Sequence, residues 1–290
     1  MSEASPLPQP PALAQQVFQA LEDKAALPPA TQLVLGLLAG LYIGFGGLFA
    51  TVALAGAQDL PFGVGQVLAG LVFSAGLALV LIAGAELLTG NMLMVGPWAA
   101  GRLGITQVLG ALGLVYAANF LGSLLLAVLV LAAGVHEAGA GAVGQAALDL
   151  AATKTGNGFL PTLASGVLAN MLVCLGVWLA YGGRTVVEKI AGLILPIAAF
   201  VAAGLEHSVA NMYLLPYGLM VQGVTGQAET GLSLGSIAAN LVPATLGNMI
   251  GGALVALAYW AAFLRRAGRP DPPAPPSRVF REPFGRSAVA

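Results

Sequence analysis

Long runs of apolar residues, separated by short polar segments, dominate the chain. The runs cover residues 33–57, 64–100, 105–134, 161–182, 190–220 and 237–264. A helix needs about 20 mostly apolar residues to cross the hydrocarbon core of a bilayer, and each run is at least that long. The pattern therefore predicts an all-α polytopic membrane protein with six transmembrane helices.

Composition and charge support this class and narrow the chemistry. The chain is 58% hydrophobic and only 8% charged, whereas a soluble domain carries about 25% charged residues. The net charge of −1 gives no basic surface for nucleic acid, so we expect the lipid bilayer as a partner and no nucleic acid. The lone Cys174 excludes a disulfide framework and a thiolate metal site, and we expect no metal or other cofactor.

Three regions are expected along the chain. Residues 1–30 form a Pro-rich tail and an amphipathic helix on the membrane surface, the alternative being a frayed tail. The apolar positions of this helix recur every four residues, at Leu13, Val17, Leu21 and Ala25. Residues 31–265 form a six-span transmembrane domain, and the Arg- and Pro-rich residues 266–290 form a disordered tail.

The placement of Lys and Arg predicts the orientation. With six spans, one side of the membrane receives both termini and the loops after the second and fourth spans. That side holds ten of the 11 Lys and Arg residues, and the other side holds only Lys154. Positively charged loops stay in the cytoplasm. We therefore expect a protein of the cell inner (cytoplasmic) membrane with both termini cytoplasmic.

The two halves of the chain carry the same motif. The pattern E-x4-N-M occurs at 86–92 and again, 120 residues later, at 206–212, inside the second and fifth apolar runs. A second echo pairs Asn119 and Gly122 of the third run with Asn248 and Gly251 of the sixth. A repeat of three spans places the second half upside down relative to the first. The sequence thus predicts two inverted three-helix repeats.

We expect the second and fifth helices to be broken at these motifs. Residues 89–91 are poor helix formers, and Gly90 permits a positive φ. Non-helical backbone at membrane depth is tolerated only where it is buried or lines a wet cavity. A half-helix that begins there points N–H groups and a positive dipole end into the pathway, which favours an anion.

Polar residues inside the apolar runs are the candidate functional residues. Glu206 and His207 are costly at bilayer depth unless they face a partner or a cavity. The alternative is a hydrogen-bonded histidine that only ties helices together. Asn170 either hydrogen-bonds His207 and fixes its tautomer or clasps two helices. Lys154 either pairs with Glu206 and draws anions in, or is a solvated loop lysine.

Four segments of the sequence resemble the formate/nitrite transporter family. They are ELLTGN at 86–91, ANMLVC at 169–174, EHSVANM at 206–212 and LGNMIGG at 246–252, within a resemblance that covers residues 12–265. The resemblance implies an aquaporin-like protomer of six spans, assembled as a homopentamer with one pore in each subunit. Thr89 is followed by Gly90 and Asn91, whereas some family members have other residues at these two positions. This difference leaves the preferred substrate open.

The resemblance also implies roles for individual residues. His207 corresponds to a central pore histidine, Thr89 to the threonine that faces it, and Asn170 to the asparagine beside it. Lys154 and Glu206 correspond to an ion pair at the outer vestibule. The apolar constrictions of the pore correspond to Phe73, Leu77, Leu87, Val173 and Phe200.

Together these features predict a pH-dependent channel for small monovalent anions of weak acids, most of all formate or nitrite. Its central histidine protonates or hydrogen-bonds the substrate. Hydrosulfide, acetate and lactate are alternatives of similar shape and charge. A neutral-solute channel is a further alternative. So is a membrane-embedded enzyme that uses Glu206 and His207, although the chain has no recognisable nucleophile or metal-ligand set.

Overall fold

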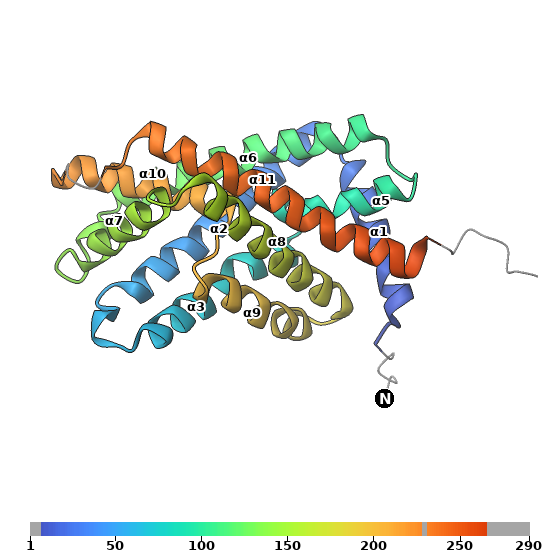
Figure 1. Cartoon of the computed structure of the whole chain (residues 1–290), viewed down its shortest axis with the longest axis horizontal. Coiled ribbons are helices and arrows are strands. Elements are labelled where there is room, and N and C mark those ends of the chain that lie inside the picture. Colours follow the sequence, from blue (N-terminus) through green and yellow to red (C-terminus); the bar gives the residue numbers. More distant parts are fainter. Residues whose placement is uncertain (1–6, 228–230, 266–290) are drawn as a thin grey trace, which may run out of the picture.

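A computed structural model describes residues 7–227 and 231–265, and all of the regular structure in these residues is helical. The helices are α1 (Pro10–Ala25), α2 (Pro29–Leu54), α3 (Phe62–Ala83), α4 (Leu88–Asn91), α5 (Val95–Ala99), α6 (Ile105–Ala132), α7 (Ala142–Thr155), α8 (Phe159–Gly182), α9 (Val186–Ala202), α10 (Ser208–Thr225) and α11 (Leu234–Tyr259). They form one elongated bundle (Figure 1). The predicted tail at 266–290 lies outside the described residues.

Six membrane crossings account for the bundle. In the described residues, α2, α3, α6, α8 and α11 are each long and apolar enough to span a bilayer alone. The remaining crossing is built from two shorter helices, α9 and α10, of 17 and 18 residues. The second crossing is likewise divided, because α4, the 3-10 turn Met92–Met94 and α5 continue α3 after an interruption. The predicted six-span, all-α architecture with broken second and fifth helices is therefore confirmed.

The two halves of the chain repeat one order of elements. Each begins with a short helix, α1 or α7, followed by a long helix, a half-helix, a break, a second half-helix and a further long helix. The short helices α1 and α7 lie at opposite ends of the molecule (Figure 1). The repeats are thus inverted, as predicted. We refer to these two ends as the α1 end and the α7 end.

The breaks lie slightly earlier in the chain than the sequence motifs suggested. Gly84 and Gly204 adopt positive φ angles of 74° and 69°, and they end α3 and precede the restart at α10. Thr89 and Gly90 are helical residues of α4, so the expected break at 89–91 was wrong. A left-handed glycine ends a helix because it has no Cβ to clash. The chain therefore turns at Gly84 and has re-entered helix by Leu88.

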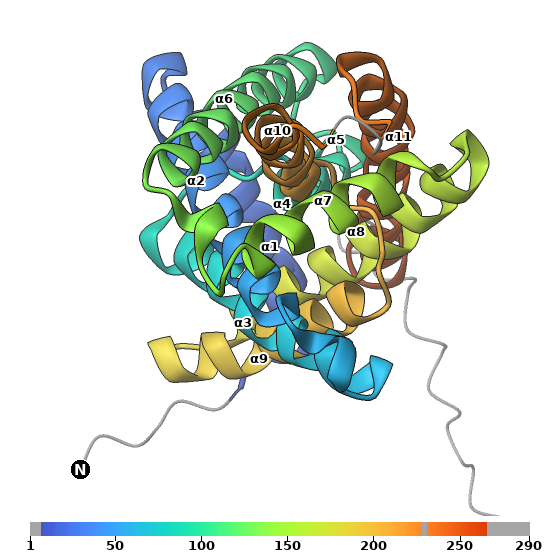
Figure 2. The same cartoon turned by 90° about the vertical axis from the view of Figure 1, so that its left-hand side faces the viewer.

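Small residues bring the long helices into close contact. A Cβ at Gly122 of α6 would overlap the carbonyl oxygen of Leu37 in α2, and one at Gly251 of α11 would overlap that of Val167 in α8. These are equivalent contacts in the two repeats. In a bilayer, such backbone approach supplies the packing energy that lipid-facing apolar residues cannot. Figure 2 shows the result from the α7 end, with α10 enclosed by the surrounding helices.

The apolar face of α1 packs on the bundle itself. Val17, Phe18 and Leu21 are buried, and the Phe18 ring fills the space beside Gly96 of α5. Arg102, at the start of α6, reaches back to Glu22 at 3.2 Å. The predicted amphipathic helix exists, but its apolar side contacts protein where we had expected the membrane surface.

We expect Gly122→Ala to destabilise the protein by about 1–3 kcal/mol, because the added methyl group meets rigid backbone. Gly113→Ala on the same helix is the control, since no atom lies within 4 Å of the position that its added methyl group would take. Thermal unfolding of both purified variants in detergent measures the difference. Equal melting temperatures would show that the α2–α6 contact does not limit stability.

Candidate functional site

His207 stands at the end of the second break, directly before α10, and its contacts define its tautomer. The backbone N–H of Ala210 donates to His207 Nδ1 at 3.1 Å, so the side chain caps α10. An acceptor at Nδ1 leaves the ring proton on Nε2. Nε2 therefore donates to the Thr89 hydroxyl, 3.0 Å away. Thr89 belongs to α4, so the two broken helices meet at this hydrogen bond.

Asn170 supports Thr89 and does not contact the histidine ring through a hydrogen bond. Its amide nitrogen donates to the carbonyl oxygens of Thr89, at 3.2 Å, and Asn248, at 2.6 Å. Both ring nitrogens of His207 are engaged elsewhere, so the expectation that Asn170 fixes its tautomer was wrong. The alternative of a clasp between helices is confirmed, since Asn170 joins α8 to α4 and α11.

Aromatic side chains surround the histidine on one side. The Phe200 ring lies over His207 with centroids 5.6 Å apart, and Phe73 meets Phe200 edge-on at 5.5 Å. A cavity of about 70 Å³ lies among these three residues and Lys154. The predicted constriction residues Leu77, Leu87 and Val173 are also buried in the core, but they do not line this cavity.

The predicted pair of Lys154 and Glu206 is present at the α7 end. Lys154 Nζ lies 3.3 Å from Glu206 Oε2, and the lysine side chain is only 13% exposed, so it is not a solvated loop lysine. Asn211 and Asn240 donate to the same oxygen at 2.5 and 3.3 Å. A cavity of about 450 Å³ opens beyond the pair, with Asp149 on its wall. It shares Lys154 as a lining residue with the small cavity beside His207, so the two cavities are neighbours at this end.

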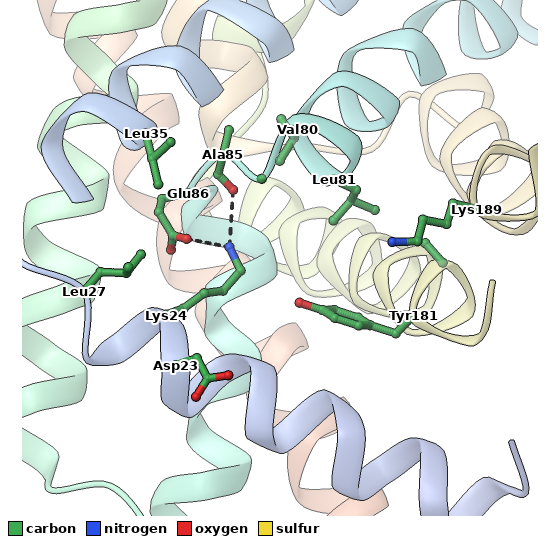
Figure 3. Close-up of a pocket in the computed structure, with 12 residues that line it drawn as sticks. Asp23, Lys24, Leu27, Leu35, Val80, Leu81, Ala85, Glu86, Tyr181 and Lys189 are labelled. Carbon is green, nitrogen blue, oxygen red and sulfur yellow. Dashed lines mark hydrogen bonds and ion pairs between the residues drawn. The ribbon is translucent and has the colours of Figure 1, made fainter. Parts of the chain in front are cut away.

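A mirror-image pair at the α1 end was missed in the sequence. Lys24 Nζ lies 2.6 Å from Glu86 Oε1 (Figure 3). Asn91 donates to Glu86 Oε2 at 2.6 Å. Lys24 and Lys154 each stand in the last turn of the short helix that opens their repeat. Together with the repeated E-x4-N-M motif, this shared position of the two lysines could have predicted the Lys24–Glu86 pair from the sequence.

Asn119 of α6 replaces the hydrogen bonds that the first break removes. Its side-chain oxygen accepts from the N–H of Leu88 at 2.9 Å, and its nitrogen donates to the carbonyl of Glu86 at 2.9 Å. A further bond to the carbonyl of Gly36, at 2.7 Å, ties the break to α2. One buried amide thus pairs a carbonyl inside the interruption and the first N–H of the half-helix that follows it.

Asn248 of α11 does the same at the second break. It accepts from the N–H of Ser208 at 2.8 Å and donates to the carbonyls of Glu206, at 2.9 Å, and Gly166, at 2.8 Å. In the sequence, Asn119 and Asn248 served only as markers of the repeat. Their role as backbone supports appears only when the break and the neighbouring long helix are seen together.

The cavity at the α1 end does not reach the histidine. It has a volume of about 340 Å³, and its lining residues include Val80 and Glu86. This cavity and the cavity beside His207 have no lining residue in common. Buried apolar side chains, including Leu77 and Leu87, account for this separation. The site is thus two polar vestibules divided by an apolar core with one imidazole and one hydroxyl in it.

Sequence comparison shows what the chain resembles. Residues 11–261 match the sequence model of the formate/nitrite transporter family. The chain is 35% identical over 269 residues to the formate channel FocA of Escherichia coli K12, covering 88% of this chain and 94% of that protein. It is 38% identical to a probable formate transporter of Methanothermobacter thermautotrophicus, covering 84% and 92%.

Solved structures show the same fold. A pentameric formate channel with formate bound superposes with a TM-score of 0.76 at 35% identity, covering 81% of this chain and 98% of that chain. An ion channel of the same family superposes with a TM-score of 0.75 at 28% identity, covering 86% and 98%.

We expect Asn248→Leu to be severely destabilising, because it leaves the N–H of Ser208 and two carbonyls unpaired at about 1–3 kcal/mol each. Thr245→Val on the same helix is the control, because within the described residues the Thr245 hydroxyl has no hydrogen-bond partner. The yield of folded protein and its melting temperature in detergent measure the effect. If Asn248→Leu melts together with Thr245→Val, Asn248 is not needed to support the break.

Proposed function

The chain belongs to the formate/nitrite transporter family, and from this premise we propose that it conducts formate across the membrane through a pore in each subunit. The observation that carries the proposal is the His207–Thr89 hydrogen bond of 3.0 Å. It joins the two broken helices beside a cavity that His207 and Lys154 both line. The family consists of transport proteins, so this chain is not an enzyme.

In this proposal the vestibules attract the anion, and the apolar core admits only its neutral acid. At the α7 end, Lys154 attracts a small anion toward the pore. Transfer of an ion into a low-dielectric core costs many kcal/mol, whereas a neutral acid costs far less. Formate therefore crosses the region of Phe73, Phe200 and Leu87 as formic acid, with a proton taken up in the vestibule. Lower pH raises the neutral fraction and the flux.

His207 acts in this scheme as a neutral hydrogen-bond donor. Its Nδ1 accepts the N–H of Ala210 and its Nε2 carries the only ring proton. A second proton on Nδ1 would face the donor of Ala210 and break the cap of α10. The Nε2–H and the Thr89 hydroxyl instead offer an oxygen of the substrate a polar resting place midway through the apolar core.

We further propose a homopentamer in the cell inner membrane with both termini in the cytoplasm. A solved relative is a pentameric formate channel, and the Lys and Arg residues gather on the side that carries the termini. Nitrite has the size and charge of formate and is the next substrate in order. The cavity beside His207 has a volume of only about 70 Å³, which favours these ions over lactate.

In proteoliposomes, we expect formate and nitrite to enter faster than acetate or lactate, and ammonium not to enter through the channel. Formate uptake should rise as external pH falls, because the neutral fraction rises. Stopped-flow light scattering with each salt gives the rates, with protein-free liposomes as the control. Ammonium flux above that control would instead support a neutral-solute channel.

We expect His207→Phe to lower formate uptake about ten-fold or more, because an unmatched polar oxygen in an apolar site costs about 1–3 kcal/mol. His207→Asn keeps a cap for α10 and a donor for Thr89. It should retain uptake within about three-fold, together with the rise at low pH. If His207→Asn conducts but has lost its pH dependence, the imidazole itself titrates during transport, and a proton-relay role replaces the hydrogen-bonding role.

A further inference from the structure

The cavity at the α1 end holds a lysine that the two mirrored ion pairs do not account for. Its charged lining residues are Asp23, Lys24, Glu86 and Lys189, and Tyr181 lies beside them. Figure 3 shows the Lys189 side chain directed into the space that Lys24 and Tyr181 also border. Lys189 is half-buried in the first turns of α9.

The charge of Lys24 is already balanced, whereas that of Lys189 is not. Glu86 uses one oxygen for Lys24 and the other for Asn91. Within the described residues, no carboxylate lies within ion-pair distance of the Lys189 ammonium group. An unpaired ammonium on a cavity wall attracts anions more strongly than a paired one.

The nearby carboxylates are committed to other partners. Glu188, the neighbour of Lys189, accepts the backbone N–H groups of Arg184 and Thr185 at 2.7 and 3.3 Å and so caps α9. Asp23 accepts from Gln19 on its own helix at 3.0 Å. Neither carboxylate forms an ion pair with the Lys189 ammonium group.

The two vestibules therefore differ in charge despite the repeat. The α1-end cavity is lined by two cations and two carboxylates, a formal sum of zero. The α7-end cavity is lined by one cation, Lys154, and two carboxylates, Asp149 and Glu206, a formal sum of −1. Low-dielectric walls focus such a difference onto ions in the cavity.

We propose that Lys189 forms a binding site for monovalent anions in the α1-end cavity, and that this site has no equivalent at the α7 end. The site positions the anion before it enters the apolar core, with the Tyr181 hydroxyl as a neighbouring donor. This inference rests on the proposed function and adds a residue and a sidedness to it. The volume of about 340 Å³ also admits an organic anion larger than formate.

Side-specific block of formate flux tests the site. Benzenesulfonate stays ionised and is too large to pass the core, so its block reports the affinity of one vestibule. It is added to right-side-out or inverted membrane vesicles, which expose opposite ends of the channel. Lys189→Gln should raise the half-inhibitory concentration about three- to ten-fold from the α1 end and leave it unchanged from the α7 end.

Two further variants separate the site from general surface charge. Lys189→Arg should restore block from the α1 end. Arg265→Gln, which removes a cation that lies on Trp260 outside the cavity, should leave the block unchanged. In the wild type alone, added salt should weaken block from the α1 end more than from the α7 end.

Equal block of wild type and Lys189→Gln from the α1 end overturns the inference and leaves the proposed function intact. So does a loss of block from both ends, or an equal loss in Arg265→Gln. A wild-type protein that carries no formate refutes the proposed function instead, which the uninhibited flux reveals before any blocker is added.

Discussion

Everything in this structure depends on satisfying peptide groups where a helix is broken inside a membrane. Lipid offers no hydrogen bonds, so each break is possible only where another part of the protein supplies them. Asn119 and Asn248 each bond to a carbonyl inside a break, to the first N–H of the half-helix that follows it and to one neighbouring helix. The glycine contacts that bring α6 against α2 and α11 against α8 hold these amides in reach. The packing of the long helices and the support of the two breaks therefore depend on each other.

The inverted repeat supplies symmetry, and the function depends on where the symmetry fails. Both breaks have a buried glutamate with a lysine and an asparagine on it. The position 120 residues before His207 is Leu87, and the position 120 residues after Thr89 is Val209. One repeat therefore contributes an imidazole and the other a hydroxyl. The two breaks therefore meet through one hydrogen bond between unlike side chains, which the repeat does not duplicate.

The sequence predicted the architecture well because the spans appear as continuous apolar runs and the repeat appears as a short motif that occurs twice. It predicted the Lys154–Glu206 pair and the meeting of His207 with Thr89 through the family resemblance. It misplaced the first break, because a positive φ at Gly84 is no more visible in the letters than one at Gly90. It left two roles open for Asn170, since spacing along one helix does not reveal which neighbouring group is closer. It missed Lys24, because α1 looked like a surface helix until its packing was known.

The contacts of His207 also indicate that attraction of the anion and its passage through the core involve different residues. An imidazole whose Nδ1 accepts a backbone N–H and whose Nε2 donates to a hydroxyl has both ring nitrogens paired while it is neutral and no substrate is bound. A charged imidazolium there would hold an anion tightly in a low-dielectric core and slow its release. Long-range attraction is better placed in the vestibules, where the Lys24 and Lys154 side chains are 22% and 13% exposed, than at the buried imidazole. A pore that keeps its charges at the two mouths and a neutral donor in the middle draws in anions yet presents the core only with species that can leave it.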